Sequence, residues 1–230
     1  MKKGGYQQYT SSRDYRNAVR LLYKDKLYKE GYKLCLKWLN KIKYGEVDVS
    51  NKHIWGCYYN LGSGMWYLKE YDKGLCFLEK ALCYADAFND NINTCNVIAM
   101  CHEDKGNKEK ALEQYNKCIL LCDEKLELIL DTKIEIETKD NILKSKAALL
   151  RNIGELLSDE SLIYDSISIY KLIQTKDKIT QEILEDKIQR NYKILCEIYI
   201  KNNNIILASK MINYITNKNI KEQLSNKVQA

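Results

Sequence analysis

The chain has 230 residues and a formal net charge of +6, and 45% of its residues are hydrophobic while 30% are charged. No apolar run approaches the roughly 20 residues that a helix needs to span a bilayer, and no apolar segment typical of a secretory signal follows the two lysines near the start. These features exclude a membrane-spanning protein, so we expect a cytoplasmic protein without a membrane partner.

Small and apolar residues recur at fixed offsets along the chain. In five places a residue that we call the anchor is followed by related residues 12 and 19 positions later. The five sets are Val19, Gly31 and Trp38; Gly62, Gly74 and Ala81; Ala99, Ala111 and Cys118; Gly154, Ser166 and Ile173; and Cys196, Ala208 and Ile215. Glycine inside a helix costs about 1 kcal/mol relative to alanine, so Gly62 and Gly74 indicate two helices that touch closely. Such self-similarity is typical of stacked helical repeats.

The repeated pattern predicts hairpins of two antiparallel helices, which must stack because a single hairpin cannot bury its apolar face alone. In chain order, we expect hairpins at about 11–44, 52–89, 91–123, 145–174 and 186–216. The Lys-Gly-Asn-Lys sequence at 105–108 and the asparagines at 202–204 are typical of turns within two of these hairpins.

Two further stretches lie outside the hairpins. Residues 124–144 are an insertion or an extended helix, because Leu126, Leu130 and Ile134 lie four residues apart. The alternation of isoleucine and glutamate at 134–137 also suits a strand. Residues 217–230 form a C-terminal cap or a tail, and a cap is favoured because stacked repeats need a polar end. We expect one continuous domain, 1–230.

Two stretches of the chain resemble the tetratricopeptide repeat (TPR). The residues that match its pattern within 58–82 are Tyr58, Leu61, Gly62, Tyr71, Gly74, Ala81 and Leu82. Those that match it within 95–119 are Ile98, Ala99, Gly106, Ala111, Tyr115, Cys118 and Ile119. The proline that ends a unit in this family is missing, because the chain contains no proline.

The TPR resemblance implies an all-α, right-handed superhelical solenoid of about five TPR-like helical hairpins, which is a scaffold for binding rather than an activity. The anchors are 37 to 55 residues apart, which exceeds the 34 residues typical of this repeat. Long repeats of this kind resemble the ligand-binding domains of Gram-positive quorum-sensing regulators, which read short peptides.

The nine cysteines raise the possibility of disulfides or a metal site. An odd count without a Cys-x-x-Cys pair argues against both. Cys118 and Cys122 lie one helical turn apart and could ligate a metal with His102 or Cys101, but we expect a reduced core and no metal. Because the chain has two histidines and none of the phosphate-binding, nucleophile-elbow or zinc-protease motifs, we expect no enzyme and no cofactor.

Asparagine occupies an equivalent position in three of the hairpins. Asn17, Asn60 and Asn152 each lie two residues before an anchor, and Asn96 lies beside that position in a fourth hairpin. An amide offers donors and an acceptor together, which suits pairing with a peptide backbone, and the TPR resemblance implies the same role. The alternative is that asparagine is simply abundant in this chain.

Positive charge is concentrated at the start of the chain. Residues 1–52 contain 13 Lys and Arg against 5 Asp and Glu, a net of +8, which leaves −2 for the remainder. The residues at helical spacing that form one basic stripe are Arg13, Arg16, Arg20 and Lys24. Arginine forks bind carboxylates and phosphates. The stripe therefore suits an acidic peptide, a free carboxylate or a nucleic-acid backbone, and the alternative is a solvated helix face.

The sequence thus predicts a non-enzymatic adaptor or peptide-sensing regulator that binds an extended peptide in a concave groove. The predicted partner is a peptide or protein with an acidic segment or a free carboxylate. The alternative is a nucleic-acid-associated factor that contacts phosphates through the basic N-terminal hairpin, and a homo-oligomer is also possible. The predicted contact residues are Arg13, Arg16, Asn17, Arg20, Lys24, Tyr59, Asn60, Ser63, Trp66, Tyr67, Asn96, Met100, Arg151, Asn152 and Lys193.

Overall fold

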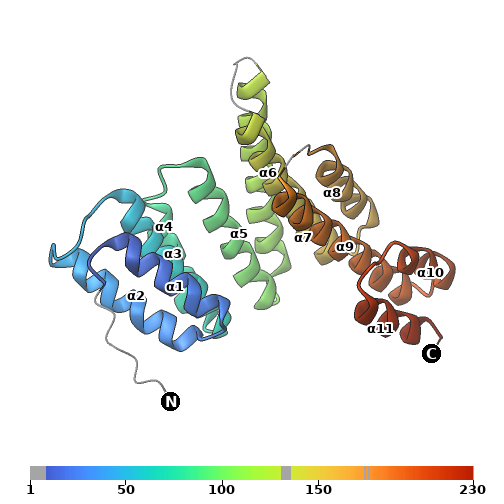
Figure 1. The fold of residues 1–230 in the computed structure, drawn as a ribbon, viewed down its shortest axis with the longest axis horizontal. Coiled ribbons are helices and arrows are strands. Elements are labelled where there is room, and N and C mark those ends of the chain that lie inside the picture. The colour runs from blue at the N-terminus through green and yellow to red at the C-terminus, as the bar shows by residue number, and fades with distance from the viewer. Residues whose placement is uncertain (1–8, 131–135, 174, 176, 230) are drawn as a thin grey trace. The chain divides into compact units, whose positions relative to one another are not determined.

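The protein is built from α-helices that pack as sequential hairpins (Figure 1). A computed structural model describes residues 9–130, 136–173, 175 and 177–229, and within these residues it contains eleven helices and no strand. The predicted all-α hairpin fold is therefore confirmed. In the same part of the chain, no helix has both the length and the apolar character that crossing a membrane requires.

The chain divides within α6 into two compact units, unit 1 (1–114) and unit 2 (115–230). The helices that begin in unit 1 are α1 (Ser12–Lys24), α2 (Tyr28–Lys43), α3 (Asn51–Tyr67), α4 (Tyr71–Leu82), α5 (Phe88–Asp104) and α6 (Lys108–Leu130). Those of unit 2 are α7 (Ile136–Leu157), α8 (Glu160–Leu172), α9 (Lys178–Lys201), α10 (Ile205–Asn213) and α11 (Lys218–Gln229). One continuous domain stays a prediction.

Several helices begin at a polar cap that the sequence supplies. At α1, the Ser11 hydroxyl accepts from the Asp14 backbone N–H at 3.2 Å, and the Asp14 carboxylate accepts from the Ser11 N–H at 3.2 Å. This reciprocal capping box satisfies two backbone donors. At α9, the Asp177 carboxylate accepts from the Thr180 N–H at 2.8 Å, so this helix begins eight residues before the hairpin start expected at 186.

The stretch 124–144, for which an insertion, an extended helix or a strand was considered, is largely helical where it is described. Helix α6 continues to Leu130 and α7 begins at Ile136. Of the four residues in the isoleucine–glutamate alternation, Ile136 and Glu137 lie in α7, whereas 134 and 135 lie outside the described residues. At the C-terminal end, α11 packs with its buried Leu224 in the same apolar core as α9 and α10.

All five anchors, and the residues 12 and 19 positions after each, are buried. The distance from each anchor to the turn that follows it shows which hairpins share the same register. Seven residues after an anchor, in four of the five hairpins, the backbone takes the left-handed conformation. The residues that do so are Lys26, Lys69, Gly106 and Asn203, with φ between +58° and +80°. The turns expected at 105–108 and 202–204 are thus confirmed.

The fourth hairpin departs from the predicted register. Its left-handed residue is Ser158 (φ +57°), which lies four residues after Gly154 rather than seven. Counted from the turn, the position of the anchor therefore falls on Arg151. Gly154 instead lies where α7 meets the start of α8, because a Cβ atom there would lie 2.9 Å from the Asp159 carbonyl oxygen. The choice of Gly154 as an anchor equivalent to Gly62 was thus wrong.

Candidate functional site

One surface of unit 1 brings together side chains from three successive first helices. We call it the α1/α3/α5 face, and it consists of Arg16 and Arg20 from α1, Trp55 and Tyr59 from α3, and Asp90 from α5. Helix α3 packs against both α1 and α5, so side chains of the two flanking helices lie next to those of α3.

The aromatic pair is fixed by stacking and by hydrogen bonds to α5. The rings of Trp55 and Tyr59 stack with their centroids 5.2 Å apart. The Trp55 Nε1–H donates to the Thr94 hydroxyl at 3.0 Å, and that hydroxyl donates to the Asp90 carbonyl oxygen at 2.7 Å. A buried indole usually needs such a partner. The pair is therefore held in one orientation before any ligand arrives.

The charged groups of the α1/α3/α5 face shift the pKa values of the acidic groups beside them. Burial raises the pKa of the Asp90 carboxyl, and the nearby Lys52 and Arg16 cations oppose this rise. Burial also raises the pKa of the Tyr59 hydroxyl, and the nearby Ser63 hydroxyl and Arg20 cation oppose this rise. The Nε atom of Arg16 is buried and lacks a hydrogen-bond partner among the described residues. Buried donors are nearly always paired, so this donor is available to a water molecule or a ligand.

The predicted aromatic anchors Trp66 and Tyr67 form a separate cluster at the end of α3. The Trp66 Nε1–H donates to the Asp104 carboxylate at 2.6 Å. The ring of Tyr67 stacks on Tyr28 with centroids 4.3 Å apart and meets Tyr23 edge-on at 6.0 Å. Tyr67 remains 43% exposed. This cluster joins α1, α2, α3 and α5, and the ring of Tyr67 remains partly open to solvent.

The remaining predicted residues of unit 1 have varied surroundings. Asn60 is only 7% exposed and its Nδ2 donates to the Gly56 carbonyl oxygen at 2.6 Å, so that donor is already used. The Asn96 Nδ2 lies 3.8 Å from the Met100 sulfur. Three others, Arg13, Asn17 and Lys24, are exposed on α1.

The predicted residues of unit 2 lie on α7 and α9. The Arg151 Nη2 donates to the Asn152 Oδ1 at 2.8 Å, and Arg151 is 8% exposed. Lys193 lies 3.8 Å from the Glu197 carboxylate and lines a pocket of about 560 Å³ together with Arg190 and with residues of the α10–α11 connection.

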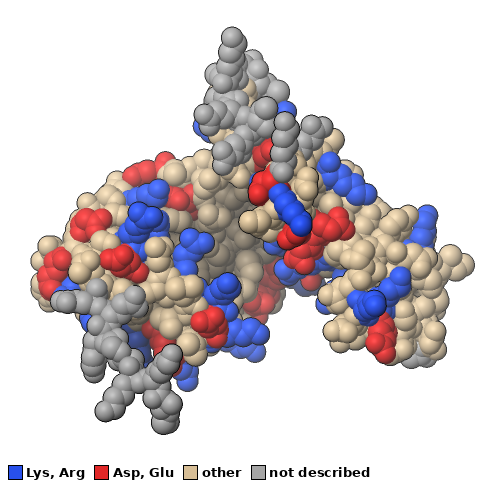
Figure 2. Space-filling view, in the orientation of Figure 1, with Lys and Arg blue, Asp and Glu red and all other residues tan. Residues whose placement is uncertain are grey.

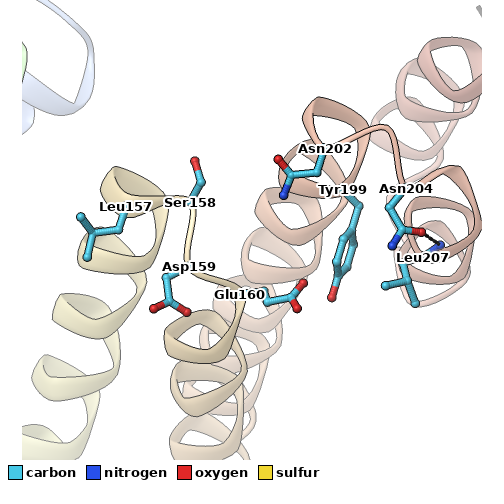
Figure 3. Close-up of a pocket in the computed structure, with 8 residues that line it drawn as sticks. All are labelled: Leu157, Ser158, Asp159, Glu160, Tyr199, Asn202, Asn204 and Leu207. Atoms are coloured by element: carbon cyan, nitrogen blue, oxygen red, sulfur yellow. Dashed lines mark hydrogen bonds between the residues drawn. The ribbon is translucent and has the colours of Figure 1, made fainter.

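A second pocket in unit 2, of about 510 Å³, lies between the α7–α8 turn and the α9–α10 turn (Figure 3). The Glu160 carboxylate and the Tyr199 hydroxyl point toward the same space (Figure 3). Burial raises the pKa of Tyr199, and hydrogen bonds with Glu160 and Tyr164 raise it further. Leu157 also lines this pocket and is 51% exposed.

The proposed metal ligands Cys101, Cys118 and Cys122 are buried and form no disulfide. Burial raises the pKa of Cys101 and of Cys122 to about 12, so both thiols are protonated at neutral pH. Within the described residues, no group of three or more His, Cys, Asp and Glu side chains could hold a metal ion.

Sequence reasoning missed Trp55 and Asp90 on the α1/α3/α5 face. Trp55 and Tyr59 lie four residues apart, and this spacing places two aromatic rings on one side of a helix, so the signal was available. Asp90 lies in the first turn of α5, where acidic residues are common for a purely local reason. Nothing in the sequence therefore distinguished it from an ordinary helix start.

The fold and its hairpin packing define a TPR-like helical repeat. The chain is similar to the crystal structure of the nearly identical TPR-like repeats of a Podospora anserina protein named as a kinesin light chain. The identity is 11% and the TM-score 0.57 over 94% of this chain and 96% of that one. A single-substitution variant of those repeats gives 11% identity and a TM-score of 0.58 over 97% and 99%. No family model matches the chain, and neither does any curated protein sequence compared with it.

Proposed function

We propose that this protein is a non-enzymatic TPR-like module that binds an extended peptide segment of a partner on the α1/α3/α5 face. The observation that carries the proposal is the buried, unpartnered Nε of Arg16 beside a fixed aromatic pair. Arginine and aromatic side chains are enriched among the residues that dominate binding energy in protein interfaces. The role in a cell would be that of a cytoplasmic adaptor or a peptide-sensing regulator.

Each part of the face has a distinct task in this proposal. Arg16 and Arg20 hold a carboxylate of the partner, either an acidic side chain or the C-terminal group, by charge-assisted hydrogen bonds. The Tyr59 ring packs against an apolar side chain of the same segment, and Trp55 supports that ring from behind. Asn17, exposed next to Arg16, supplies an amide for the peptide backbone.

The alternative of nucleic-acid binding through the basic first hairpin is less well supported. Over α1 to α4, at the left of Figure 2, basic and acidic side chains are interspersed. Arg16 lies near Asp90 rather than in an isolated basic patch. A surface that tracks a phosphate backbone is expected to carry a more continuous positive charge.

A selection from a library of random peptides displayed on phage tests the proposal. Peptides retained by the full chain would be synthesised with a fluorophore, and their affinity measured by anisotropy at two salt concentrations. We expect acidic peptides that bind the Arg16→Gln and Tyr59→Ala variants about tenfold more weakly. A matched control is Lys33→Gln, which removes one exposed charge from α2 and should leave affinity unchanged.

Two results would contradict the proposal. Peptides that bind wild type and both variants equally would show that the α1/α3/α5 face is not the binding surface. If single-stranded DNA or RNA instead bound with an affinity that falls steeply with salt, while no peptide did, the nucleic-acid alternative would be favoured.

A further inference from the structure

Unit 2 contains a group of cations that surrounds one buried arginine. Arg151 comes from α7, Lys187 and Arg190 come from α9, and the Tyr170 hydroxyl comes from α8. Helix α8 packs against α7 and α9, and α7 also contacts α9. The four side chains therefore converge from three helices of one unit.

Arg151 is the least satisfied of these groups. Only 8% of it is exposed, and its Nη2 donates to Asn152, but its Nε and Nη1 atoms are buried without a hydrogen-bond partner among the described residues. A buried charge is costly unless it is paired and fully hydrogen-bonded. Each unpaired donor adds to that cost. Arg151 is therefore a buried charge with two unpaired donors, which is unfavourable for folding.

The register of the hairpins shows that packing does not require an arginine here. Counted from the left-handed turn residue, Arg151 stands where the other four hairpins place Val19, Gly62, Ala99 and Cys196. Those four residues are small or apolar and are buried. A long cation at a position that elsewhere accepts glycine is not explained by packing, which favours a chemical role.

The surroundings of Arg151 are rich in positive charge. Burial lowers the pKa of Arg151, and the Arg190 cation lowers it further. Burial likewise lowers the pKa of Lys187, and the Arg151 and Arg190 cations lower it further. Glu155 and Asp186 act in the opposite direction, but within the described residues none of the three cations has a carboxylate oxygen within 4.0 Å. Within the described residues, the three cations thus lack a directly contacting counter-ion.

We propose that Arg151, Lys187, Arg190 and the Tyr170 hydroxyl form an oxyanion-binding site in unit 2. The ligand is a carboxylate or phosphate group, both of which accept several hydrogen bonds from arginine and lysine. The Nε and Nη1 donors of Arg151 bind the anion from the buried side, Lys187 and Arg190 neutralise its charge, and the tyrosine hydroxyl donates a further hydrogen bond. This site does not depend on the α1/α3/α5 face of unit 1.

Nuclear magnetic resonance of the arginine side chains tests this site directly. The chain has only five arginines, so the Nε–Hε region of a ¹⁵N spectrum should hold five peaks, which single substitutions assign. Inorganic phosphate and acetate would be titrated separately into the full chain at constant ionic strength. We expect a saturable shift of the Arg151 peak, while the peak of the exposed Arg13 stays in place.

Charge variants on one helix supply the matched comparison. Arg190→Gln and Lys187→Gln should each weaken the anion about tenfold, as the loss of a hydrogen bond to a charged group does. Lys178→Gln removes an exposed charge from the same helix, α9, outside the cluster, and should have no effect. Circular dichroism would establish that each variant is folded.

The two titrations also identify the source of the anion. Saturation by phosphate alone supports a phosphorylated partner, and saturation by acetate supports a carboxylate. The proposal is overturned if neither anion moves the Arg151 peak, or if it moves no more than the Arg13 peak. It is equally overturned if Lys178→Gln weakens binding as much as Arg190→Gln. The Arg151 peak reports on unit 2 alone. A negative anion titration therefore leaves the peptide-binding proposal for unit 1 unaffected, and a negative peptide selection leaves the anion site unaffected.

Discussion

Gly62 and Gly74 meet backbone to backbone where α3 packs on α4. A Cβ atom on Gly62 would lie 3.1 Å from the Gly74 carbonyl oxygen, and one on Gly74 would lie 3.2 Å from the Gly62 carbonyl oxygen. On Gly62 the same atom would also lie 2.5 Å from the Leu78 Cγ. The close contact predicted from these two glycines is therefore present, and it explains why a helix interior tolerates them.

The first prediction concerns this contact. Gly62→Ala should lower the free energy of unfolding by about 1–2 kcal/mol, because overpacking outweighs the gain in helix propensity of about 1 kcal/mol. Chemical denaturation monitored by circular dichroism measures the change. The control is Gly56→Ala in the same helix, where the nearest atom to a Cβ is 3.5 Å away, and which should be neutral or stabilising. Similar losses in both variants would refute the close-contact explanation.

The second prediction concerns a buried hydrogen-bonded relay in unit 2. The Asn191 Nδ2 donates to the Ser166 hydroxyl at 2.8 Å, and that hydroxyl donates to the Ala147 carbonyl oxygen at 2.7 Å. Ser166→Ala should cost about 1–3 kcal/mol of unfolding free energy, since it leaves a buried donor without a partner. Adding Asn191→Leu should recover part of that loss. Strict additivity of the two changes would show that the relay contributes nothing as a pair.

The third prediction concerns the thiols. Cys76 and Cys83 are exposed, and the other seven of the nine cysteines are buried. A thiol-specific reagent at pH 8 should therefore modify two cysteines in the folded protein and all nine after denaturation. Rapid modification of more than two in the folded state would contradict the assigned core.

The buried thiols predict that the folded protein becomes less stable at high pH. Burial raises the pKa of Cys57, Cys101 and Cys122 from 9.0 to about 12. The folded state thus holds these protons more tightly than the unfolded state, so their contribution is complete below pH 9 and is lost as the pH rises toward 12. Urea denaturation from pH 8 to pH 11 measures the slope. Cys101→Ala should make it shallower, and an unchanged slope would be evidence against this assignment.

The fourth prediction concerns Asp90, whose pKa burial raises above 3.8 against the opposing effect of Lys52 and Arg16. An acid with a raised pKa in the folded state loses stability as the pH rises through that pKa. Asp90→Asn should therefore increase stability at pH 7 relative to wild type, and the gain should vanish near pH 3, where both side chains are neutral. A loss at pH 7 that is absent at pH 3 would show that the two cations outweigh burial.

The sequence revealed the hairpins because their packing is local and periodic. Small residues such as Gly62 and Ala99 recur where helices must touch, and their partners follow 12 and 19 residues later in the same hairpin. The fourth hairpin was set in the wrong register because Gly154 is small for another reason, the close approach of the Asp159 carbonyl. Only the position of the turn at Ser158 separates the two explanations, and a turn formed by a serine with positive φ has no strong sequence signal.

The candidate site was less predictable than the fold. The basic stripe on α1 identified Arg16 and Arg20, because charge and helical spacing can be read directly. Their neighbours in the candidate site, Trp55 and Asp90, come from other helices, and the proximity of these side chains depends on how α1, α3 and α5 pack. Asn60 illustrates the opposite case, since its position in the repeat suggested a ligand contact while its Nδ2 bonds to its own helix.

Site-specific photo-crosslinking in nuclease-treated host lysate tests the central claim most directly. A benzophenone amino acid would replace Tyr59 on the α1/α3/α5 face or, as a control, Tyr44, which follows α2 and is 72% exposed. The account predicts that the Tyr59 variant crosslinks one or a few proteins through a defined peptide segment, and that Arg16→Gln in the same chain removes these products. Identical products from the Tyr44 position, or products that persist with Arg16→Gln, would contradict it.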